Sequence, residues 1–241
     1  GERVLIREWT LNSKWRLTDF TRQDYRKIIF EILLGHNIEL VHIRHLLSHT
    51  FDAPDIAASL NIPVILSFHD FYFTCPTINL LDDNNIFCGG KCTPGHGVCS
   101  VPFDSSSSLP QLKHAWIKVW QNKASRLFGN IDAFVTTSKA SKNIILKSYP
   151  FLEKHHFPVI EHGRDLKQQN NSATAPSSSE VIRILIPGHL DIHKGGDFIK
   201  KLIDCDSSDR LEFWFLGRTT KDFQKLGKCL GEYEREDFFV A

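Results

Sequence analysis

Short apolar runs and segments with helical spacing alternate along most of this chain. The continuous apolar runs at 62–68 and 131–136 suit strands that are buried on both faces of a parallel sheet. Apolar residues recur at helical spacing in 21–34 and in 109–128, which places one face of each segment on a core. Strands that alternate with helices connect through right-handed crossovers, so the sequence predicts an α/β protein with mainly parallel sheets.

A polar segment separates two such series. Residues 168–180 (QQNNSATAPSSSE) contain few apolar side chains and resemble a linker. We therefore predict an N-terminal domain over 1–167, which includes a cysteine-rich loop at 75–108, and a C-terminal domain over 181–241. The C-terminal stretch is short for a whole α/β domain, and the chain begins with Gly and contains no Met. We expect the sequence to be part of a longer protein.

The charge balance excludes a protein that coats nucleic acid. Lys and Arg number 29 and Asp and Glu number 28, a formal net charge of +1, whereas binding through counterion release needs a concentrated basic surface. No run approaches the roughly 18 apolar residues of a membrane span. These features predict a soluble, cytoplasmic chain with no nucleic-acid partner.

Polar clusters follow four of the predicted strands. His69–Asp70 follows the run at 62–68, and His162–Arg164 follows a short strand at 159–161. In the second series, the segments 188–196 and 217–218 occupy equivalent places. Ligands of open parallel sheets bind beyond the carboxyl ends of the strands. Four clusters at such ends indicate a ligand-binding cleft.

The segment 188–196 (GHLDIHKGG) combines glycines with a lysine at the predicted start of a helix. Glycines let a ligand approach the backbone, the Lys194 ammonium can neutralise a phosphate, and a helix N-terminus favours anions. Arg218 could supply a second cation. The spacing matches neither the P-loop nor the dinucleotide fingerprint. Phosphate binding and a glycine-rich turn with a solvated lysine therefore stay equal alternatives.

Taken in order, these motifs resemble those of bacterial GT-B-fold glycosyltransferases of the family 4 type, which are retaining enzymes that use nucleotide sugars. HDFYFTCP and GHLDIHKG are the most specific parts of the resemblance. It implies two Rossmann-like domains, an N-terminal one on the acceptor side and a C-terminal one, apparently partial here, that binds the donor. The resemblance rests on VHIRHL, IPVILSFHDFYFTCPTINLLDDNNIFCGG, FVTTSKASK, VIEHGRD, ILIPGHLDIHKGGD, LEFWFLGR and LGEYERED.

The resemblance also implies roles for single residues. His69 would be catalytic and close to the transferred sugar, and Asp70 and His45 would lie on the acceptor side. By its spacing alone, His45 is more typical of a core or rim histidine, as are His42 and His49. The candidate donor-binding residues are Gly163, Arg164, Gly188, Lys194, Gly195 and Arg218.

The chain departs from the family pattern at the donor site. His189 stands where many relatives have arginine, and Arg218 or His193 are the candidates to replace that cation. The carboxylate pair of the family, Glu-x7-Glu, is expected beyond Asp237. A non-catalytic module of the same fold, which binds a sugar nucleotide or supports assembly, is therefore the alternative function.

The implied reaction transfers a sugar from a nucleotide-sugar donor to a hydroxyl of a glycan or lipid-linked acceptor, with retention, in the synthesis of cell-surface polysaccharide or glycolipid. Lys194 and helix N-termini can stabilise the leaving diphosphate, so catalysis requires no cofactor.

The pair Asp82–Asp83 is expected to serve a turn. The basic side of the helix at 109–128 is either simply solvated or rests on anionic lipid, which would place the protein at the inner face of the cell membrane.

Four cysteines fall within the irregular loop, with the spacing C-x12-C-x3-C-x6-C and with His96 between the last two. Four thiolates can close a tetrahedral zinc site, and in a cytosolic protein metal binding or reduced thiols are favoured over disulfides. Structural zinc and reduced thiols remain open alternatives, and a zinc-stabilised interaction domain is a third possible function. The four are Cys75, Cys88, Cys92 and Cys99, whereas Cys205 and Cys229 are expected to be ordinary small apolar residues.

Overall fold

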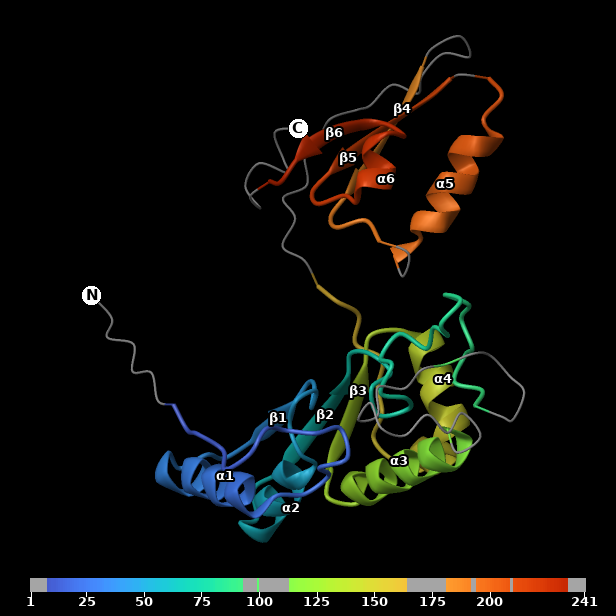
Figure 1. Ribbon diagram of the computed structural model, residues 1–241. Coiled ribbons are helices and arrows are strands. Elements are labelled where there is room, and N and C mark those ends of the chain that lie inside the picture. Colours follow the sequence, from blue (N-terminus) through green and yellow to red (C-terminus); the bar gives the residue numbers. More distant parts are fainter. Residues whose placement is uncertain are drawn as a thin grey trace. The chain divides into compact units, whose positions relative to one another are not determined.

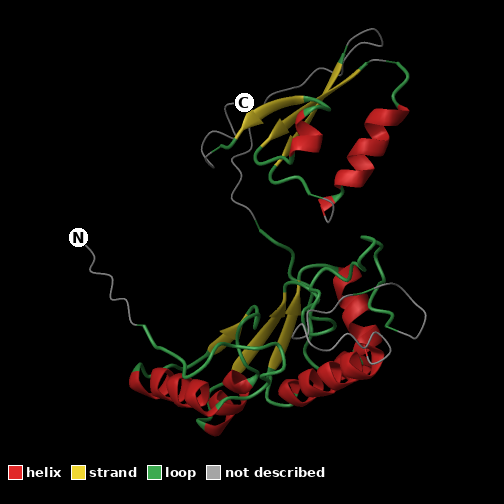
Figure 2. Ribbon diagram, in the orientation of Figure 1, coloured by secondary structure: helices red, strands yellow, loops and turns green. Residues whose placement is uncertain are grey.

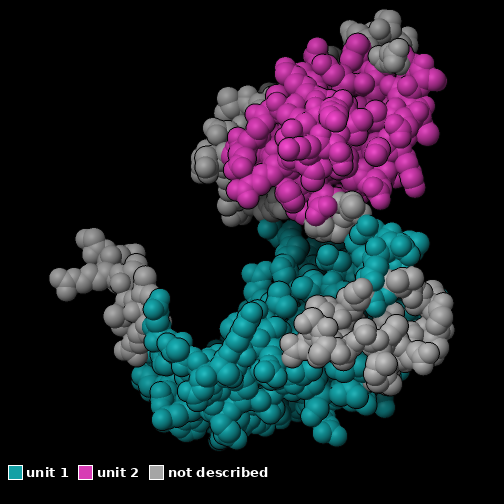
Figure 3. Space-filling view, in the orientation of Figure 1, with its two compact units in different colours: residues 1–164 teal, residues 165–241 magenta. Residues whose placement is uncertain are grey.

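The computed structural model describes residues 8–92, 99, 113–163, 181–191, 194–208 and 210–233. The chain divides into two compact units, residues 1–164 and 165–241 (Figures 1 and 3). Within the described residues each unit contains a three-stranded parallel sheet with helices packed on it (Figure 2). This arrangement confirms the expected α/β class. The predicted linker at 168–180 lies outside the described residues.

The sheet of the first unit has the order β1-β2-β3, with β1 (Val41–Ile43), β2 (Val64–Phe68) and β3 (Ala133–Thr136) all parallel. The strand β2 begins after Pro63, which has no N–H to donate, although its carbonyl accepts a hydrogen bond from the backbone of β1. Beyond β3, Val159 forms a parallel bridge with the last residue of that strand. Four chain segments therefore end at the same edge of this sheet.

The helices of the first unit follow the predicted pattern closely. In chain order they are α1 (Gln23–Gly35), α2 (Asp52–Ser59), α3 (Lys113–Phe128) and α4 (Lys139–Ser148), followed by a short 3₁₀ helix (Pro150–Lys154). The helices α1 and α2 contact each other (Figure 1). The helix α4 is capped at its N-terminus, because the hydroxyl of Ser138 accepts a hydrogen bond from a first-turn N–H.

Aromatic side chains fill the core of the first unit. Phe68 on β2 contacts Phe134 on β3 at 6.0 Å and Phe128 on α3 at 5.6 Å, measured between ring centroids. Trp120 is 1% exposed, and its indole N–H donates to the backbone carbonyl of Tyr72 at 2.9 Å. This bond ties α3 to the segment that follows β2. The aromatic core thus holds in place the loop that follows the carboxyl end of β2.

The second unit has the order β4-β5-β6, and all three strands are parallel. Its core consists of aromatic residues of β5 together with one aromatic residue of α6 and apolar residues of α5. The sequence pattern does not predict α6 or β6, because α6 is a single turn and β6 is exposed at every residue. The elements are β4 (Ile182–Pro187), α5 (Gly196–Cys205), β5 (Leu211–Leu216), α6 (Lys221–Gln224) and β6 (Lys228–Gly231).

The described helices include none that is both long enough and apolar enough to span a membrane.

Asp82, one half of the acidic pair, serves the turn in which it lies. Its carboxylate accepts hydrogen bonds from the backbone N–H groups of Asn84 and Ile86, at 2.9 and 2.8 Å.

Candidate functional site

The carboxyl ends of the strands of the first unit carry three histidines and an aspartate. His45 follows β1, His69 and Asp70 follow β2, and His162 follows the segment that pairs with β3. Parallel alignment brings all of them to one edge of the sheet, which is the ligand-binding edge of such folds. We call these four residues the strand-end cluster.

Asp70 is held by two donors. The ring Nε2 of His45 lies 2.8 Å from one carboxylate oxygen, and the backbone N–H of Tyr72 donates to the other at 2.7 Å. The backbone N–H of Leu47 donates to Nδ1 of His45 at 2.7 Å. Because Nδ1 accepts a hydrogen bond, the proton of this imidazole lies on Nε2, and His45 is a neutral donor to Asp70. The aspartate is therefore fixed as a hydrogen-bond acceptor.

Tyr72 supports this arrangement from the core. Its ring stacks on the imidazole of His45, with 5.0 Å between the centroids, and the residue is 1% exposed. Burial raises the pKa of its hydroxyl, and the charge of Asp70 adds to the increase. Tyr72 therefore stays neutral, and its buried ring packs against the His45 that contacts Asp70.

His69 and His162 face each other at the same edge. Their rings are perpendicular, with 5.9 Å between the centroids, and both side chains are exposed. Two accessible imidazoles can hydrogen-bond the hydroxyl groups of a ligand and can accept or donate a proton. The sequence placed His162 in a polar cluster after a predicted strand, but we assigned it no role of its own. Gly163 follows it directly, and Arg164 lies outside the described residues.

Two other histidines of the first unit have partners of their own. The Nε2 atom of His42 lies 2.7 Å from the hydroxyl of Ser67, and Nδ1 of His49 lies 2.8 Å from the hydroxyl of Tyr25. Burial lowers the pKa of His49. These contacts fit a supporting role at the rim of the sheet.

The second unit has a pocket of about 410 Å³ at the carboxyl ends of its strands. Among the predicted donor residues, Gly188 and Arg218 line it, while Lys194 and Gly195 are not among its lining residues. Gly188 and Gly217 form its floor, and their backbones nearly touch: a Cβ on Gly217 would lie 2.7 Å from the carbonyl oxygen of Gly188. The remaining lining residues are His189, Glu232 and Tyr233.

Arg218 is paired within this pocket. Its Nε donates to the carboxylate of Glu232 at 2.8 Å, which raises the pKa of the guanidinium. The partner was not predicted, because nothing in the sequence distinguishes Glu232 from its acidic neighbours. A phosphate that enters this pocket would meet an arginine already oriented by a carboxylate.

Lys194 and Gly195 lie at the start of α5. Gly195 has a φ of +86°, a conformation that suits glycine, and Gly196 is buried so closely that a Cβ there would lie 2.8 Å from the ring of Phe223. Lys194 is exposed, next to the N-terminal turn of a ten-residue helix. The local geometry therefore combines a cation with the positive end of a helix dipole. His193 lies outside the described residues.

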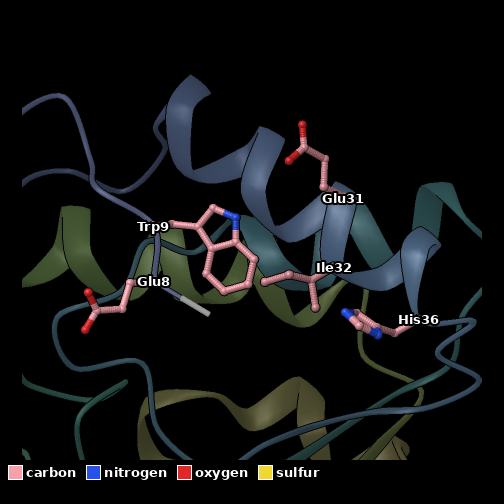
Figure 4. Close-up of a pocket in the computed structure, with 5 residues that line it drawn as sticks. All are labelled: Glu8, Trp9, Glu31, Ile32 and His36. Atoms are coloured by element: carbon pink, nitrogen blue, oxygen red, sulfur yellow. The ribbon is translucent and has the colours of Figure 1, made fainter. Parts of the chain in front are cut away.

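A separate hollow of about 300 Å³ lies along α1, lined by two residues that precede the helix and three near its end. In Figure 4 the indole of Trp9 lies beside the side chain of Ile32, and the carboxylates of Glu8 and Glu31 point away from each other. His36 completes the lining. This hollow contains none of the strand-end residues, and we assign no ligand to it.

Comparison with known proteins gives one family. Residues 3–168 match the family Glycosyltransferase Family 4, and this range includes the whole strand-end cluster. A comparison with curated protein sequences finds no match.

Two solved structures are also similar to the chain. One is HepE of Anabaena in complex with UDP and glucose, at 15% identity and a TM-score of 0.43, with 87% of this chain and 51% of that chain covered. The other is a UDP-glucosyltransferase from Polygonum tinctorium capable of glucosylating indoxyl, in complex with 3,4-dichloroaniline, at 13% identity and a TM-score of 0.40, with 88% and 53% covered. The chain thus spans about half the length of either protein.

Proposed function

The chain belongs to glycosyltransferase family 4, and on that premise we propose that the full-length protein transfers a sugar from a nucleotide-sugar donor to a hydroxyl group of an acceptor. The observation that carries this proposal is the strand-end cluster. His69 and His162 are exposed and face each other, and Asp70 is fixed beside them as a hydrogen-bond acceptor. Accessible imidazoles with an ordered carboxylate are suited to binding and deprotonating sugar hydroxyls.

In the proposed reaction the acceptor oxygen forms a bond to the anomeric carbon of the donor sugar. The bond between that carbon and the diphosphate oxygen breaks, the hydroxyl proton passes to a base, and a nucleoside diphosphate leaves. We place His69 in contact with the transferred sugar, and we propose that the anomeric configuration is retained. Asp70 and His45 position the acceptor side of the cluster, since their hydrogen bonds join the residue that follows His69 to the segment that follows β1.

We propose that the second unit binds the donor diphosphate without a cofactor. Lys194 and the N-terminus of α5 supply positive charge at one place, and Gly188 and Arg218 line the pocket at the ends of β4 and β5. Gly188 and Gly195 leave their backbones accessible, because no other atom lies near the position of a Cβ at either residue. We also propose that Gly163 and Arg164, which belong to the first unit, contribute to donor binding.

Replacing Lys194 with alanine should weaken the binding of nucleoside diphosphate by the full-length protein about tenfold, or roughly 1.4 kcal/mol, because one ammonium–phosphate contact is lost. Isothermal titration calorimetry measures the change. Lys201→Ala is the matched control: that lysine is also exposed, but it lies within α5 and away from the start of the helix, and its loss should leave the affinity unchanged. Equal affinities of wild type and Lys194→Ala would remove Lys194 from the donor site.

We further propose a cytoplasmic protein that acts on a glycan or lipid-linked acceptor in the synthesis of cell-surface polysaccharide or glycolipid, with peripheral contact at the inner face of the membrane. The support for this contact is the exposed side of α3, which carries Lys118 and Arg126 on either side of Asn122. The full-length protein should sediment with vesicles that contain anionic lipid, and a Lys118→Ala/Arg126→Ala variant should sediment less. Equal sedimentation of the two proteins would refute the contact.

A further inference from the structure

The four cysteines of the irregular loop converge on one cavity of the first unit. Cys75 lies at the end of the segment that follows β2, and Cys88 follows a short antiparallel pairing of Leu81 with Phe87. All four cysteines, including Cys92 and Cys99, line the same cavity of about 20 Å³. This volume is sufficient for a single occupant the size of a water molecule.

The backbone between the second and third cysteine forms a tight turn. Gly89 and Gly90 have φ values of +61° and +77°, and the N–H of Lys91 donates to the carbonyl of Cys88 at 3.1 Å. A Cβ on Gly90 would lie 3.3 Å from the methyl group of Thr74, so this turn packs closely on the residue that precedes Cys75. The glycines therefore bring two parts of the cysteine set together across the cavity.

The sulfur of Cys75 already accepts a hydrogen bond. The hydroxyl of Thr77 donates to its Sγ at 3.2 Å. Donors to sulfur stabilise a thiolate, and such hydrogen bonds are usual around metal-bound cysteines. Four thiolates around one small cavity would repel one another, whereas a bound cation of charge two would stabilise them together.

We propose that these four cysteines bind one zinc ion, which stabilises the loop between β2 and α3. Binding displaces the four thiol protons to solvent, changes no oxidation state, and leaves a site of net charge −2 beside the ammonium of Lys91, which also lines the cavity. Thiolates select zinc over harder divalent ions, and a closed shell of four is the arrangement of structural sites. This proposal is independent of sugar transfer.

The ion must draw the sulfurs inward. Among the described residues no three His, Cys, Asp or Glu side chains are placed to hold a metal ion as they stand, whereas zinc requires sulfur ligands at about 2.3 Å. All six cysteines lie in the described part of the chain, and no disulfide joins any two of them. No disulfide therefore competes with zinc for these sulfurs.

The test is metal and thiol analysis of the purified full-length protein. We expect one zinc ion per chain by mass spectrometry, four additional thiols reactive towards Ellman's reagent after chelation, and a lower melting temperature in the chelated protein. Cys88→Ser and Cys92→Ser should lose the zinc. Cys205→Ser and Cys229→Ser are matched controls, because both residues are exposed in the second unit, and these variants should keep it.

A second measurement needs no variant. Reconstitution of the metal-free wild type with Co²⁺ should give the absorption bands of tetrahedral cobalt with thiolate charge transfer. The proposal is overturned by either of two results with no bound metal: all six thiols reactive in the untreated protein, which indicates reduced cysteines, or thiols that appear only after reduction, which indicates disulfides.

Discussion

Replacing His69 with alanine in the full-length protein should lower kcat for sugar transfer by about 100-fold or more, because a catalytic imidazole contributes roughly this much to proton transfer and sugar binding in a transition state. The Kd for nucleoside diphosphate should change less than about threefold, since His69 lies in the first unit and the proposed diphosphate residues Lys194 and Arg218 lie in the second. Steady-state kinetics and calorimetry measure the two quantities separately.

His156→Ala provides the control for this experiment. His156 is also an exposed histidine of the first unit, but its carbonyl accepts from Phe134 near the start of β3, away from the carboxyl ends of the strands. This variant should retain wild-type turnover. If His69→Ala turns over like the wild type, or if its defect lies wholly in donor affinity, His69 is not at the reaction centre.

The Asp52→Ala substitution should lower the free energy of unfolding of the protein by about 2–3 kcal/mol, because donors that contact a buried carboxylate are left without an acceptor. Asp52 is 1% exposed, and one of its carboxylate oxygens accepts from the backbone N–H of Arg22 at 2.9 Å and from the hydroxyl of Thr50 at 2.7 Å. The other oxygen accepts from the guanidinium of Arg26 at 2.8 Å. Without the carboxylate, these donors lose their acceptor in a desolvated place. Urea unfolding measures the effect.

Asp55→Ala is the matched comparison. Asp55 pairs with the same guanidinium of Arg26 at 2.7 Å, but its side chain is 54% exposed. Exposed pairs contribute at most about 1 kcal/mol, so this variant should be nearly as stable as the wild type. Equal and small losses for the two variants would show that Asp52 does not hold the segment before α1 against α2.

Much of the fold follows from sequence pattern. The apolar spacing in 21–34 locates α1, which ends at Gly35. The apolar run at 62–68 locates β2, although the strand begins only at Val64, after Pro63. The same reasoning places His69 and Asp70 at the carboxyl edge of a parallel sheet, where the structure has them. These features depend on local periodicity and on single residues that begin or end an element.

Other features depend on contacts that periodicity does not encode. Asp52 has the pattern of an ordinary acidic residue in a first helical turn, and its importance comes from partners in a different segment. The proton position on His45 is set by one backbone N–H of a neighbouring turn. The glycine-rich segment 188–196 suggested one phosphate site, whereas the structure separates it into a pocket at Gly188 and a helix start at Lys194.

The central claim is sugar transfer at the strand-end cluster, and analysis of the reaction products tests it most directly. The full-length protein is incubated with a panel of nucleotide sugars and with glycan or lipid-linked acceptors, and the products are characterised by mass spectrometry and NMR. We expect one nucleoside diphosphate released for each new glycosidic bond, with the anomeric configuration of the donor retained, and loss of both products in His69→Ala. A wild-type protein that binds a nucleotide sugar but forms no glycosidic bond with any acceptor would contradict the account.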